Sequence, residues 1–204
     1  MPKETFFNLP EEKRERILMA VVKEISRVPI DKISINKIIH DAEISRGSFY
    51  QYFIDKDDVI KYVTYDYIKN IRERVVESFR ASEGDVFKAV EIILRGTMEY
   101  IIKSGNINFS KNILIQVKTD VEKTIDLAVN STDCILKIFK ENMDISKLKE
   151  KNNEAIDDLL QMIFSIFKET VTRIFYDINN AELEYERFVR QIEIIKWGAI
   201  KEIK

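Results

Sequence analysis

The feature that most constrains the fold of this 204-residue chain is an apolar pattern with helical spacing along almost its whole length. Near the N-terminus the apolar residues that share one face of an amphipathic helix are Ile17, Leu18, Val21, Val22 and Ile25. The chain contains only 5 Gly and 3 Pro, so few turn signals interrupt the pattern. Strict alternation of apolar and polar residues, which would indicate a half-buried strand, is absent. The sequence therefore predicts an all-α fold.

The first third of the chain divides into four expected helices, because short polar residues precede each apolar segment. The expected helices cover 10–28, 35–42, 46–52 and 56–79. The residues placed to cap them are Asn8, Ser34, Ser45 and Asp55. The first helix is expected to end at Val28, because a residue before proline disfavours helical backbone angles.

The rest of the chain also predicts helices. They are expected over 86–104, closed by Gly105, over 109–142 as one or two helices with a break at 130–133, and over 154–178 and 181–203. The polar stretch 144–153 predicts a loop. We therefore expect two domains: a small N-terminal domain over 9–69 and a larger helical bundle over 70–204.

The composition argues against catalysis and against metal binding. Cys134 and His40 are the only cysteine and histidine, so a disulfide, a cysteine–histidine metal site and a serine–histidine pair have no support. One enzymatic alternative remains, the acids Glu91 and Glu99 two turns apart on one expected helix, a pair that also suits a solvated face. We expect no enzyme, no metal and no cofactor. Because the N-terminus lacks an apolar core and no run of about 18 apolar residues occurs, we expect a cytoplasmic protein without a membrane partner.

Residues 34–53 carry the functional signal, because two short helices joined by a tight turn form a helix-turn-helix. The residues placed to pack these helices are Ile38, Ile39, Ala42, Ile44 and Phe49. The outward residues of the second short helix offer hydrogen-bond donors and flat rings but no acid: Ser45, Arg46, Gly47, Ser48, Tyr50, Gln51 and Tyr52. A helix that enters the major groove needs such a surface. The net charge is only −2, so this placement, and not composition, indicates DNA binding.

The stretch from Ile44 to Phe53, Ile-Ser-Arg-Gly-Ser-Phe-Tyr-Gln-Tyr-Phe, followed by Asp55-Lys56-Asp57-Asp58, resembles the DNA-binding pattern of the TetR family of bacterial regulators. The resemblance covers roughly the first third of the chain. It implies base reading by Arg46, Gly47 and Gln51. It implies phosphate contacts by Ser34, Tyr50, Tyr52 and Lys56, with Asn36 or Lys37 at the groove edge.

The resemblance also implies the partners of this protein. It implies a homodimeric repressor that binds a palindromic operator in double-stranded DNA and is released by an unidentified small-molecule effector. The larger domain would then serve dimerisation and effector binding. The alternative is a DNA-bound adaptor of the same fold that has no inducer.

Glu43 departs from the family pattern, which usually has Gly at this position of the turn. Gly tolerates a positive φ, which costs a residue with a side chain about 1 kcal/mol. Two hypotheses follow. Either Glu43 adopts a positive φ in a strained turn, or it keeps a helical φ and pairs with Lys37 or Arg46.

The last two expected helices carry apolar stripes broader than one face, so one face could meet a second copy of the chain. The residues expected at this dimer interface are Ile156, Leu160, Ile163, Phe164, Phe167, Val171, Ile174, Phe188, Ile192 and Ile195. The alternative is that both stripes serve one monomer core. The resemblance further implies an effector cavity but does not say which residues line it. The candidates, chosen as aromatic and methionine residues that could equally belong to the core, are Tyr65, Met98, Phe109 and Phe139.

Overall fold

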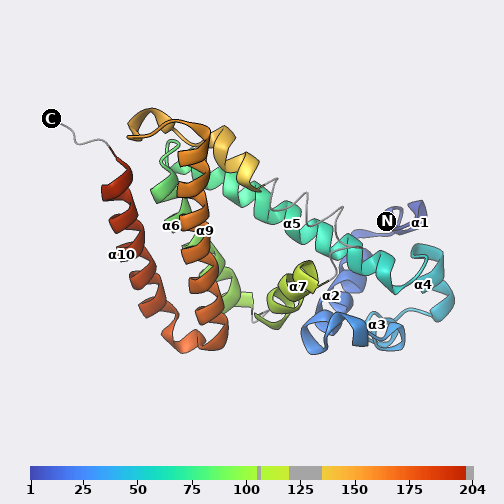
Figure 1. Ribbon diagram of the computed structural model, residues 1–204. Coiled ribbons are helices and arrows are strands. Elements are labelled where there is room, and N and C mark those ends of the chain that lie inside the picture. The colour runs from blue at the N-terminus through green and yellow to red at the C-terminus, as the bar shows by residue number, and fades with distance from the viewer. Residues whose placement is uncertain (105–106, 120–134, 201–204) are drawn as a thin grey trace. The chain divides into compact units, whose positions relative to one another are not determined.

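A computed structural model of the chain describes Met1–Ser104, Ile107–Thr119 and 135–200. Within these residues the regular elements are helices, and the only bridge of strand type is an isolated pair between Leu148 and Ile200. The all-α prediction is therefore confirmed (Figure 1). No helix in the described part of the chain is both long and apolar enough to cross a membrane.

The observed helices agree with the expected ones to within a few residues. They are α1 Glu4–Phe7, α2 Glu11–Arg27, α3 Ile35–Asp41, α4 Arg46–Tyr52, α5 Lys56–Ala81, α6 Val86–Ser104, α7 Ile107–Thr119, α9 Asn153–Tyr176 and α10 Ala181–Ala199. Three short 3-10 turns join them: η1 Ile30–Lys32, η2 Ile145–Lys147 and η3 Ile178–Asn180. Residues 135–142 are also helical. Gly105 and the break expected at 130–133 lie outside the described residues.

Two of the four predicted capping residues accept the expected hydrogen bond. The Ser48 amide donates to Ser45 Oγ at 3.0 Å, and the Asp58 amide donates to Asp55 Oδ1 at 2.9 Å. The other two predictions are wrong. Helix α2 begins after Pro10 with no side-chain cap, and the Ser34 side chain accepts no bond from α3.

The chain forms two compact units, and the boundary between them falls within α5. The N-terminal unit comprises Met1–Ile71 together with α7. Its core includes the fully buried rings of Phe6, Phe49 and Phe53, and α7 adds Phe109 and Ile113 to the same cluster. Residues from far along the sequence thus complete the core beneath the helix-turn-helix, a feature that the expected division at residue 69 did not include.

Helix α7 is also joined to α2 by hydrogen bonds. Asn112 Nδ2 donates to the carbonyl oxygens of Ile25 at 2.6 Å and Val28 at 3.2 Å, at the end of α2. Tyr67 of α5 donates to Ser110 Oγ at 3.1 Å and stacks edge-on against Phe109. The two Asn112 bonds satisfy carbonyl groups that the end of α2 leaves without a partner in the helix itself.

The N-terminal arm, Met1–Leu9, contains the short helix α1, which the sequence did not predict. It covers the C-terminal end of α4. The Phe6 ring is fully buried, with its centroid 5.0 Å from that of Phe53 and 5.7 Å from that of Tyr62. The Lys3 amide donates to Tyr52 O at 2.8 Å, and the Lys3 ammonium donates to Tyr50 O at 2.8 Å. The arm therefore fixes the last turn of α4.

The C-terminal unit comprises the described residues of 72–104 and 135–200. Helices α9 and α10 form an antiparallel pair joined by η3, and both pack on α6 (Figure 1). The rings of Phe79, Phe139 and Phe164 form a chain of edge-to-face contacts with centroids 4.8 Å apart. Gly84 is required where α5 turns toward α6, because its φ is +78° and a Cβ would lie 3.1 Å from Asp144.

Candidate nucleic-acid interface

Helices α3 and α4 are held together by small and aromatic side chains. Ala42 and Ile38 are fully buried, and Phe49 packs inward with its ring centroid 5.2 Å from that of Phe53. Helices of only seven residues are marginal alone, so this packing and the underlying α2 keep them folded. The helix-turn-helix predicted over residues 34–53 is present.

The turn between them has the strained geometry expected from the first hypothesis. Glu43 has φ +54° and is 77% exposed. Its amide donates to His40 O at 3.2 Å, and the Ile44 amide donates to Ile39 O at 3.0 Å. These two bonds define a Schellman motif, whose positive-φ position usually holds Gly. The rival hypothesis is wrong, since Lys37 pairs with Asp41 and Arg46 with Asn36.

Glu43→Gly is expected to raise the free energy of unfolding by up to about 1 kcal/mol, because it relieves the positive φ. It should also strengthen DNA binding, because a carboxylate leaves a surface that meets phosphates, and this gain should shrink as salt rises. Thermal melts and salt-titrated binding curves measure both effects.

Glu83→Gly is a matched control for this change. Glu83 is exposed, has φ +52° and occupies the same Schellman position at the end of α5, in the C-terminal unit. It should stabilise the protein similarly and leave DNA binding unchanged. A lower melting temperature together with weaker DNA binding in Glu43→Gly would contradict the strained-turn account.

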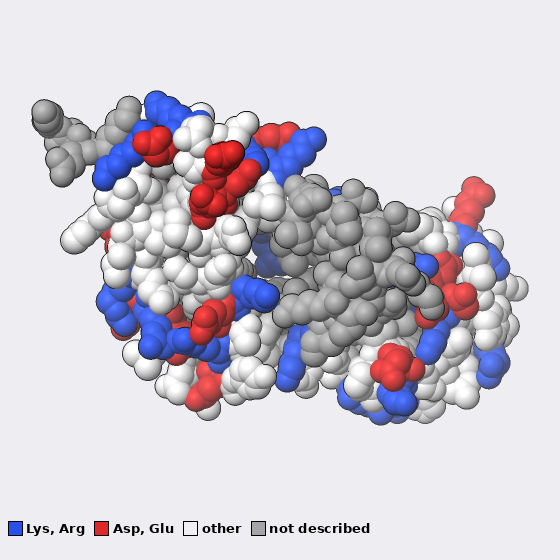
Figure 2. Space-filling model, in the orientation of Figure 1, with Lys and Arg blue, Asp and Glu red and all other residues white. Residues whose placement is uncertain are grey.

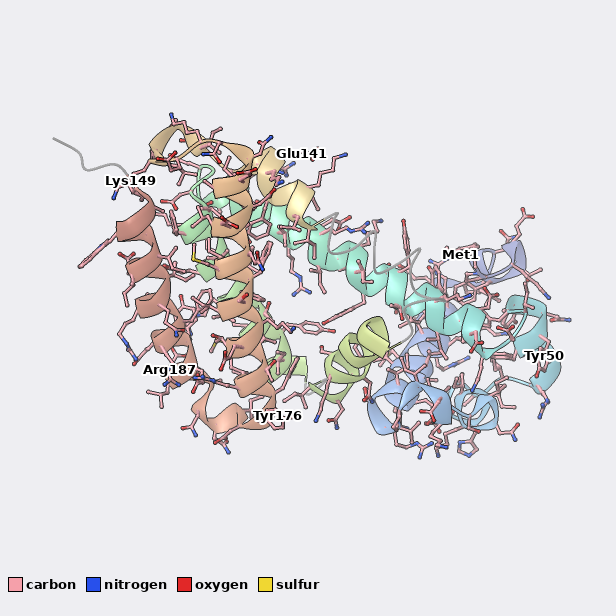
Figure 3. All side chains as sticks on the ribbon, viewed as in Figure 1. Met1, Tyr50, Glu141, Lys149, Tyr176 and Arg187 are labelled. Carbon is pink, nitrogen blue, oxygen red and sulfur yellow. The ribbon has the colours of Figure 1, made fainter. Side chains whose placement is uncertain are left out.

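The outward face of α4 exposes most of the residues that the sequence predicted to contact DNA. Ser45, Arg46 and Gln51 are exposed, and Tyr50 is 38% exposed on the outer side of the helix (Figure 3). Arg46 donates to Asn36 Oδ1 at 3.0 Å and lies over the Tyr50 ring, 5.9 Å from its centroid. Asn36 of α3 thus orients the guanidinium from the neighbouring helix.

Gly47 has no structural requirement within the chain. A Cβ at this position would meet only Ser45 Oγ, at an ordinary 3.7 Å. The absence of a side chain therefore leaves room outside the protein, beside Arg46. Close approach of DNA to the backbone at this point stays a prediction.

Tyr52 corrects one prediction. It was expected to point outward toward phosphate, but it is only 6% exposed. Residue 52 lies three positions after the buried Phe49, so it shares the inward face of α4. Its ring packs near Phe6, with centroids 6.4 Å apart, and the Lys13 ammonium lies 5.8 Å from the Tyr52 centroid.

Glu24 is a functional candidate that sequence reasoning missed. Its carboxylate is only 2% exposed and binds the Arg27 guanidinium through two bonds of 2.7 Å. It also accepts the Ser34 amide at 3.0 Å, so it fixes the start of α3. Its pKa is lowered, chiefly because Arg27 donates hydrogen bonds to it. The sequence feature that could have identified Glu24 is an acid on the apolar face of α2, three residues before an arginine.

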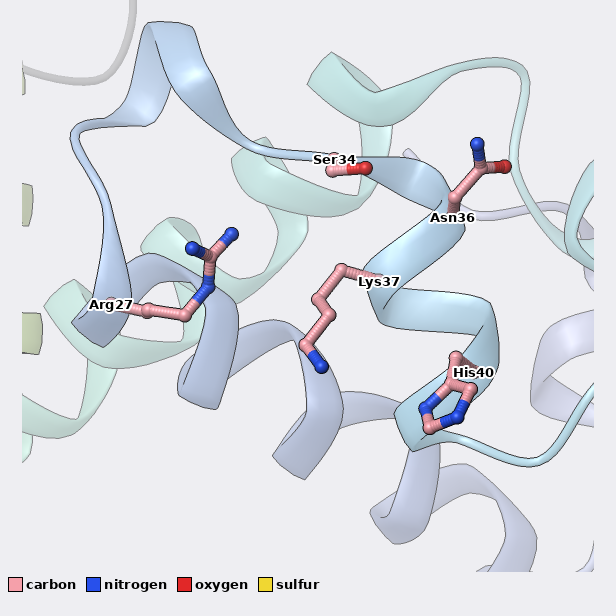
Figure 4. A pocket seen from close by; sticks show the side chains of 5 residues that line it. All are labelled: Arg27, Ser34, Asn36, Lys37 and His40. Carbon is pink, nitrogen blue, oxygen red and sulfur yellow. The ribbon is translucent and has the colours of Figure 1, made fainter.

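An open pocket lies on the surface of α3 and the end of α2. Its lining residues are Arg27, Ser34, Asn36, Lys37 and His40 (Figure 4). Beside it, the Asp41 carboxylate is 11% exposed and pairs with Lys23 at 2.9 Å, with His40 at 3.0 Å and with Lys37 at 3.7 Å. The pKa of Asp41 is held well below its usual range, chiefly by the hydrogen bond from Lys23. The remaining predicted phosphate contact, Lys56, places its ammonium 3.4 Å from Asp31 O.

The residues predicted for the dimer interface require correction. Seven of the ten are buried within the single chain: Ile156, Leu160, Ile163, Val171, Ile174, Phe188 and Ile192. Phe164, Phe167 and Ile195 are half-buried. The seven buried side chains face the core that α9, α10 and α6 share, so they are not available to a second copy. For these seven residues, the inward face of each stripe had been taken for the outward one.

The outward faces of α9 and α10 carry a different apolar set. Its exposed members are Met162, Tyr176, Leu183, Ile194 and Trp197. Leu183, Ile194 and Trp197 are spaced by 11 and then 3 residues, which places them on one face of α10. Tyr176 is 82% and Trp197 is 78% exposed. Figure 2 shows an uncharged area over these two helices on the face in view.

The four candidate effector-pocket residues are divided between the two units, and a shared cavity stays a prediction. Phe109 lies in the core of the N-terminal unit, and Tyr65 is 44% exposed on α5 in the same unit. Met98 and Phe139 are buried in the C-terminal unit. Glu91 and Glu99, the two acids of the enzymatic alternative, lie in different surroundings. Burial and the nearby Glu193 raise the pKa of Glu91, whereas Glu99 is exposed.

Comparisons with known proteins agree with this architecture. Residues 17–63 match the family model described as bacterial regulatory proteins, tetR family. Residues 85–199 match that of the tetracyclin repressor-like C-terminal domain, which covers more than half of the chain. A curated relative, the uncharacterized HTH-type transcriptional regulator YvdT of Bacillus subtilis (strain 168), is 29% identical over 97 residues. These residues are 48% of this chain and 47% of YvdT, so the match spans about half the length of that relative.

Solved structures share the fold over nearly the whole chain. A TetR family transcriptional regulator from Chloroflexus aurantiacus J-10-FL is 23% identical and has a TM-score of 0.62, with 99% of this chain and 100% of that one covered. FadR from Bacillus subtilis, solved in complex with stearoyl-CoA, is 19% identical with a TM-score of 0.68, covering 87% of this chain and 96% of FadR.

Proposed function

Because this chain belongs to the TetR family of bacterial transcriptional regulators, we propose that it is a homodimeric repressor that binds a palindromic operator and leaves it when a small molecule binds. The family consists of regulators and not of enzymes. One observation carries the DNA contact: the exposed face of α4 offers Arg46, Tyr50 and Gln51 without an acid. Its partner DNA would place the protein in the bacterial cytoplasm.

The direct contacts divide into base reading and backbone positioning. Arg46 has the forked donors that suit guanine, and Gln51 can bond to adenine in the major groove. Ser34, Ser45 and Tyr50 offer hydroxyl groups that suit phosphate oxygens, which position a protein without reading sequence. We therefore assign sequence preference to α4 and register on the DNA to the surrounding hydroxyl and cationic groups.

The outward apolar residues of α9 and α10 support the homodimer. A second copy related by a two-fold axis would cover Leu183, Ile194 and Trp197 with the same residues of its own, as in a four-helix interface. Exposed apolar area of this kind marks an interaction surface. Two copies would present two α4 helices to half-sites about 34–36 Å apart or more.

Helix α7 supports a route for release by an effector. It packs on α2 and holds the carbonyls of Ile25 and Val28 through Asn112. A small molecule that displaced α7 would therefore disturb the helix on which α3 and α4 rest. FadR, which shares the fold, was solved with stearoyl-CoA, so a ligand-bound member with this architecture exists. Its ligand is not assigned to this chain.

Arg46→Ala is the test of the DNA assignment. The operator can be selected from random duplex DNA with the wild-type protein, and binding to its single-base variants then measured. We expect a loss of about 1–3 kcal/mol in discrimination at one base position. As a comparison, Lys56→Ala should weaken binding to all duplexes alike and flatten the dependence on salt. If Arg46→Ala weakened every sequence equally, Arg46 would not read a base.

A further inference from the structure

We propose that Lys3 and Thr5 of the N-terminal arm help to set the sequence preference of the protein without reading a base themselves. They hold the end of α4 in the position from which Gln51 contacts its base, so they are positioning residues that act through Gln51. The proposal rests on the DNA-binding function above and names the residues that support one of its two base contacts. Figure 1 shows α1 of the arm beside α4.

The end of α4 leaves three carbonyl groups for the arm to bind. A helix leaves its last four carbonyl oxygens without a partner inside the helix. In α4 the first of these, Phe49 O, accepts the Phe53 amide at 2.9 Å. Phe53 itself has extended backbone angles, with φ −129° and ψ 152°, and the following Ile54 amide donates to Asp58 Oδ2 at 3.1 Å. The carbonyls of residues 50–52 therefore need donors from another segment.

The arm supplies a donor to each of these three carbonyls. The Lys3 ammonium donates to Tyr50 O and the Lys3 amide donates to Tyr52 O, both at 2.8 Å. Between them, the Thr5 hydroxyl donates to Gln51 O. The last turn of α4 contains no basic residue, so the Lys3 ammonium places a positive charge at the negative end of the helix dipole. The arm therefore acts as the C-terminal cap of the reading helix.

Buried neighbours anchor the arm, so its donors stay in place. Pro2 and Phe6, which lie on either side of Lys3 and Thr5 in the sequence, are both buried. The Phe6 amide also donates to Lys3 O at 2.9 Å and fixes the turn between these residues. Removal of the two side-chain donors should therefore leave the arm docked while the carbonyls at the end of α4 lose their partners.

The two base contacts of α4 have different supports. Arg46 lies in the first turn, where Ser45 caps the helix and Asn36 accepts the guanidinium at 3.0 Å. Gln51 lies in the last turn, where Thr5 binds its own carbonyl. A recognition group must be held within about 0.5 Å of its productive position, and helix ends without partners open easily. Loss of the donors of the arm should therefore impair the contact of Gln51 and spare that of Arg46.

The test uses the full chain and the operator selected from random duplex DNA. Gln51→Ala and Arg46→Ala first identify the base pair at which each side chain discriminates. Lys3→Met combined with Thr5→Val then removes the two side-chain donors with little change in side-chain size. We expect discrimination at the base pair of Gln51 to fall about threefold to tenfold, as for the loss of one hydrogen bond, and discrimination at the base pair of Arg46 to stay unchanged.

Two controls separate positioning from direct contact with DNA. Lys3→Arg combined with Thr5→Ser keeps both donors and the charge, so it should retain discrimination at both base pairs. Thr5→Val alone changes no charge, so its loss of discrimination at the base pair of Gln51 cannot come from a lost phosphate contact. Circular dichroism and thermal melts check that each variant is folded.

Three results would overturn the proposal. The first is full discrimination at the base pair of Gln51 in the double variant. If this result comes with weaker binding to every duplex and a flatter dependence on salt, Lys3 contacts a phosphate instead. The second is an equal loss of discrimination at both base pairs, which would mean that α4 as a whole is weakened. The third is a Gln51→Ala variant that discriminates like the wild type at every position.

Failure of the DNA-binding function itself would look different. Selection would then yield no preferred duplex, and Arg46→Ala would not change discrimination. The three results above all keep a selected operator and a base pair that Arg46→Ala identifies, so they contradict the role of the arm and leave the DNA-binding function in place.

Discussion

Ile194→Asp combined with Trp197→Asp is expected to make the protein monomeric and to weaken operator binding about a hundredfold or more. Both side chains are largely exposed on the single chain, at 70% and 78%, so the change should leave the fold intact. A buried Trp contributes about 150–250 Å² to an interface, and placing charges there leaves them without partners. Each monomer then binds one half-site, without the gain in affinity that comes from linking two DNA-binding units in one dimer.

Sedimentation velocity measures the assembly, and circular dichroism checks the fold. Ile92→Asp is a matched control, because Ile92 is a 41% exposed isoleucine of α6, outside the α9 and α10 faces. It should remain dimeric. Ile192→Asp should instead unfold the C-terminal unit, since Ile192 is fully buried. If the double variant still sediments as a dimer, the dimer interface lies on another surface of the protein.

Phe6→Ala is expected to lower the free energy of unfolding by about 3–5 kcal/mol and to reduce DNA affinity. The Phe6 ring is fully buried between the N-terminal arm and the end of α4, so its removal leaves a cavity beside Phe53 and Tyr62. The arm also covers the carbonyls of Tyr50 and Tyr52 at the last turn of α4. When the arm detaches, the reading helix loses this support.

Phe7→Ala is the control for this prediction. The Phe7 ring lies 5.5 Å from Phe6 and 5.9 Å from Tyr62, but Phe7 is 45% exposed. Its truncation should cost about 1 kcal/mol or less, because much of the ring is already in water. Denaturant unfolding and binding to the selected operator measure both variants. Equal effects of the two changes would show that the buried position of Phe6 has no special role.

The parts predicted well from the sequence are those that local chemistry decides. The helix-turn-helix followed from Ser45 as a cap, from the buried Phe49 and from the acid-free face around Arg46. The position of the tight turn at Glu43 was also predicted, but the sequence left its φ open, and the structure decides for the positive value. In each case residues close in sequence determine the geometry.

The parts that could not be predicted depend on which surfaces meet. The broad apolar stripes on α9 and α10 indicated that each helix buries two faces. They did not show which face packs inside the monomer, so Ile192 was assigned to the dimer interface and Trp197 was not considered. The arm around Phe6 has too few residues for a helical period. The burial of Glu24 becomes visible only when Arg27 and Ser34 are placed beside it.

The docking of α7 on α2 has a consequence for the exchange of domains between regulators. The DNA-binding part does not end near residue 69, because Phe109 and Ile113 of α7 belong to its core. Asn112 of α7 also donates hydrogen bonds to the carbonyls of Ile25 and Val28. A chimera joined at that point would leave this core open. Grafting a new operator preference onto this protein should therefore replace the outward residues of α4 and leave the scaffold, α7 included, in place.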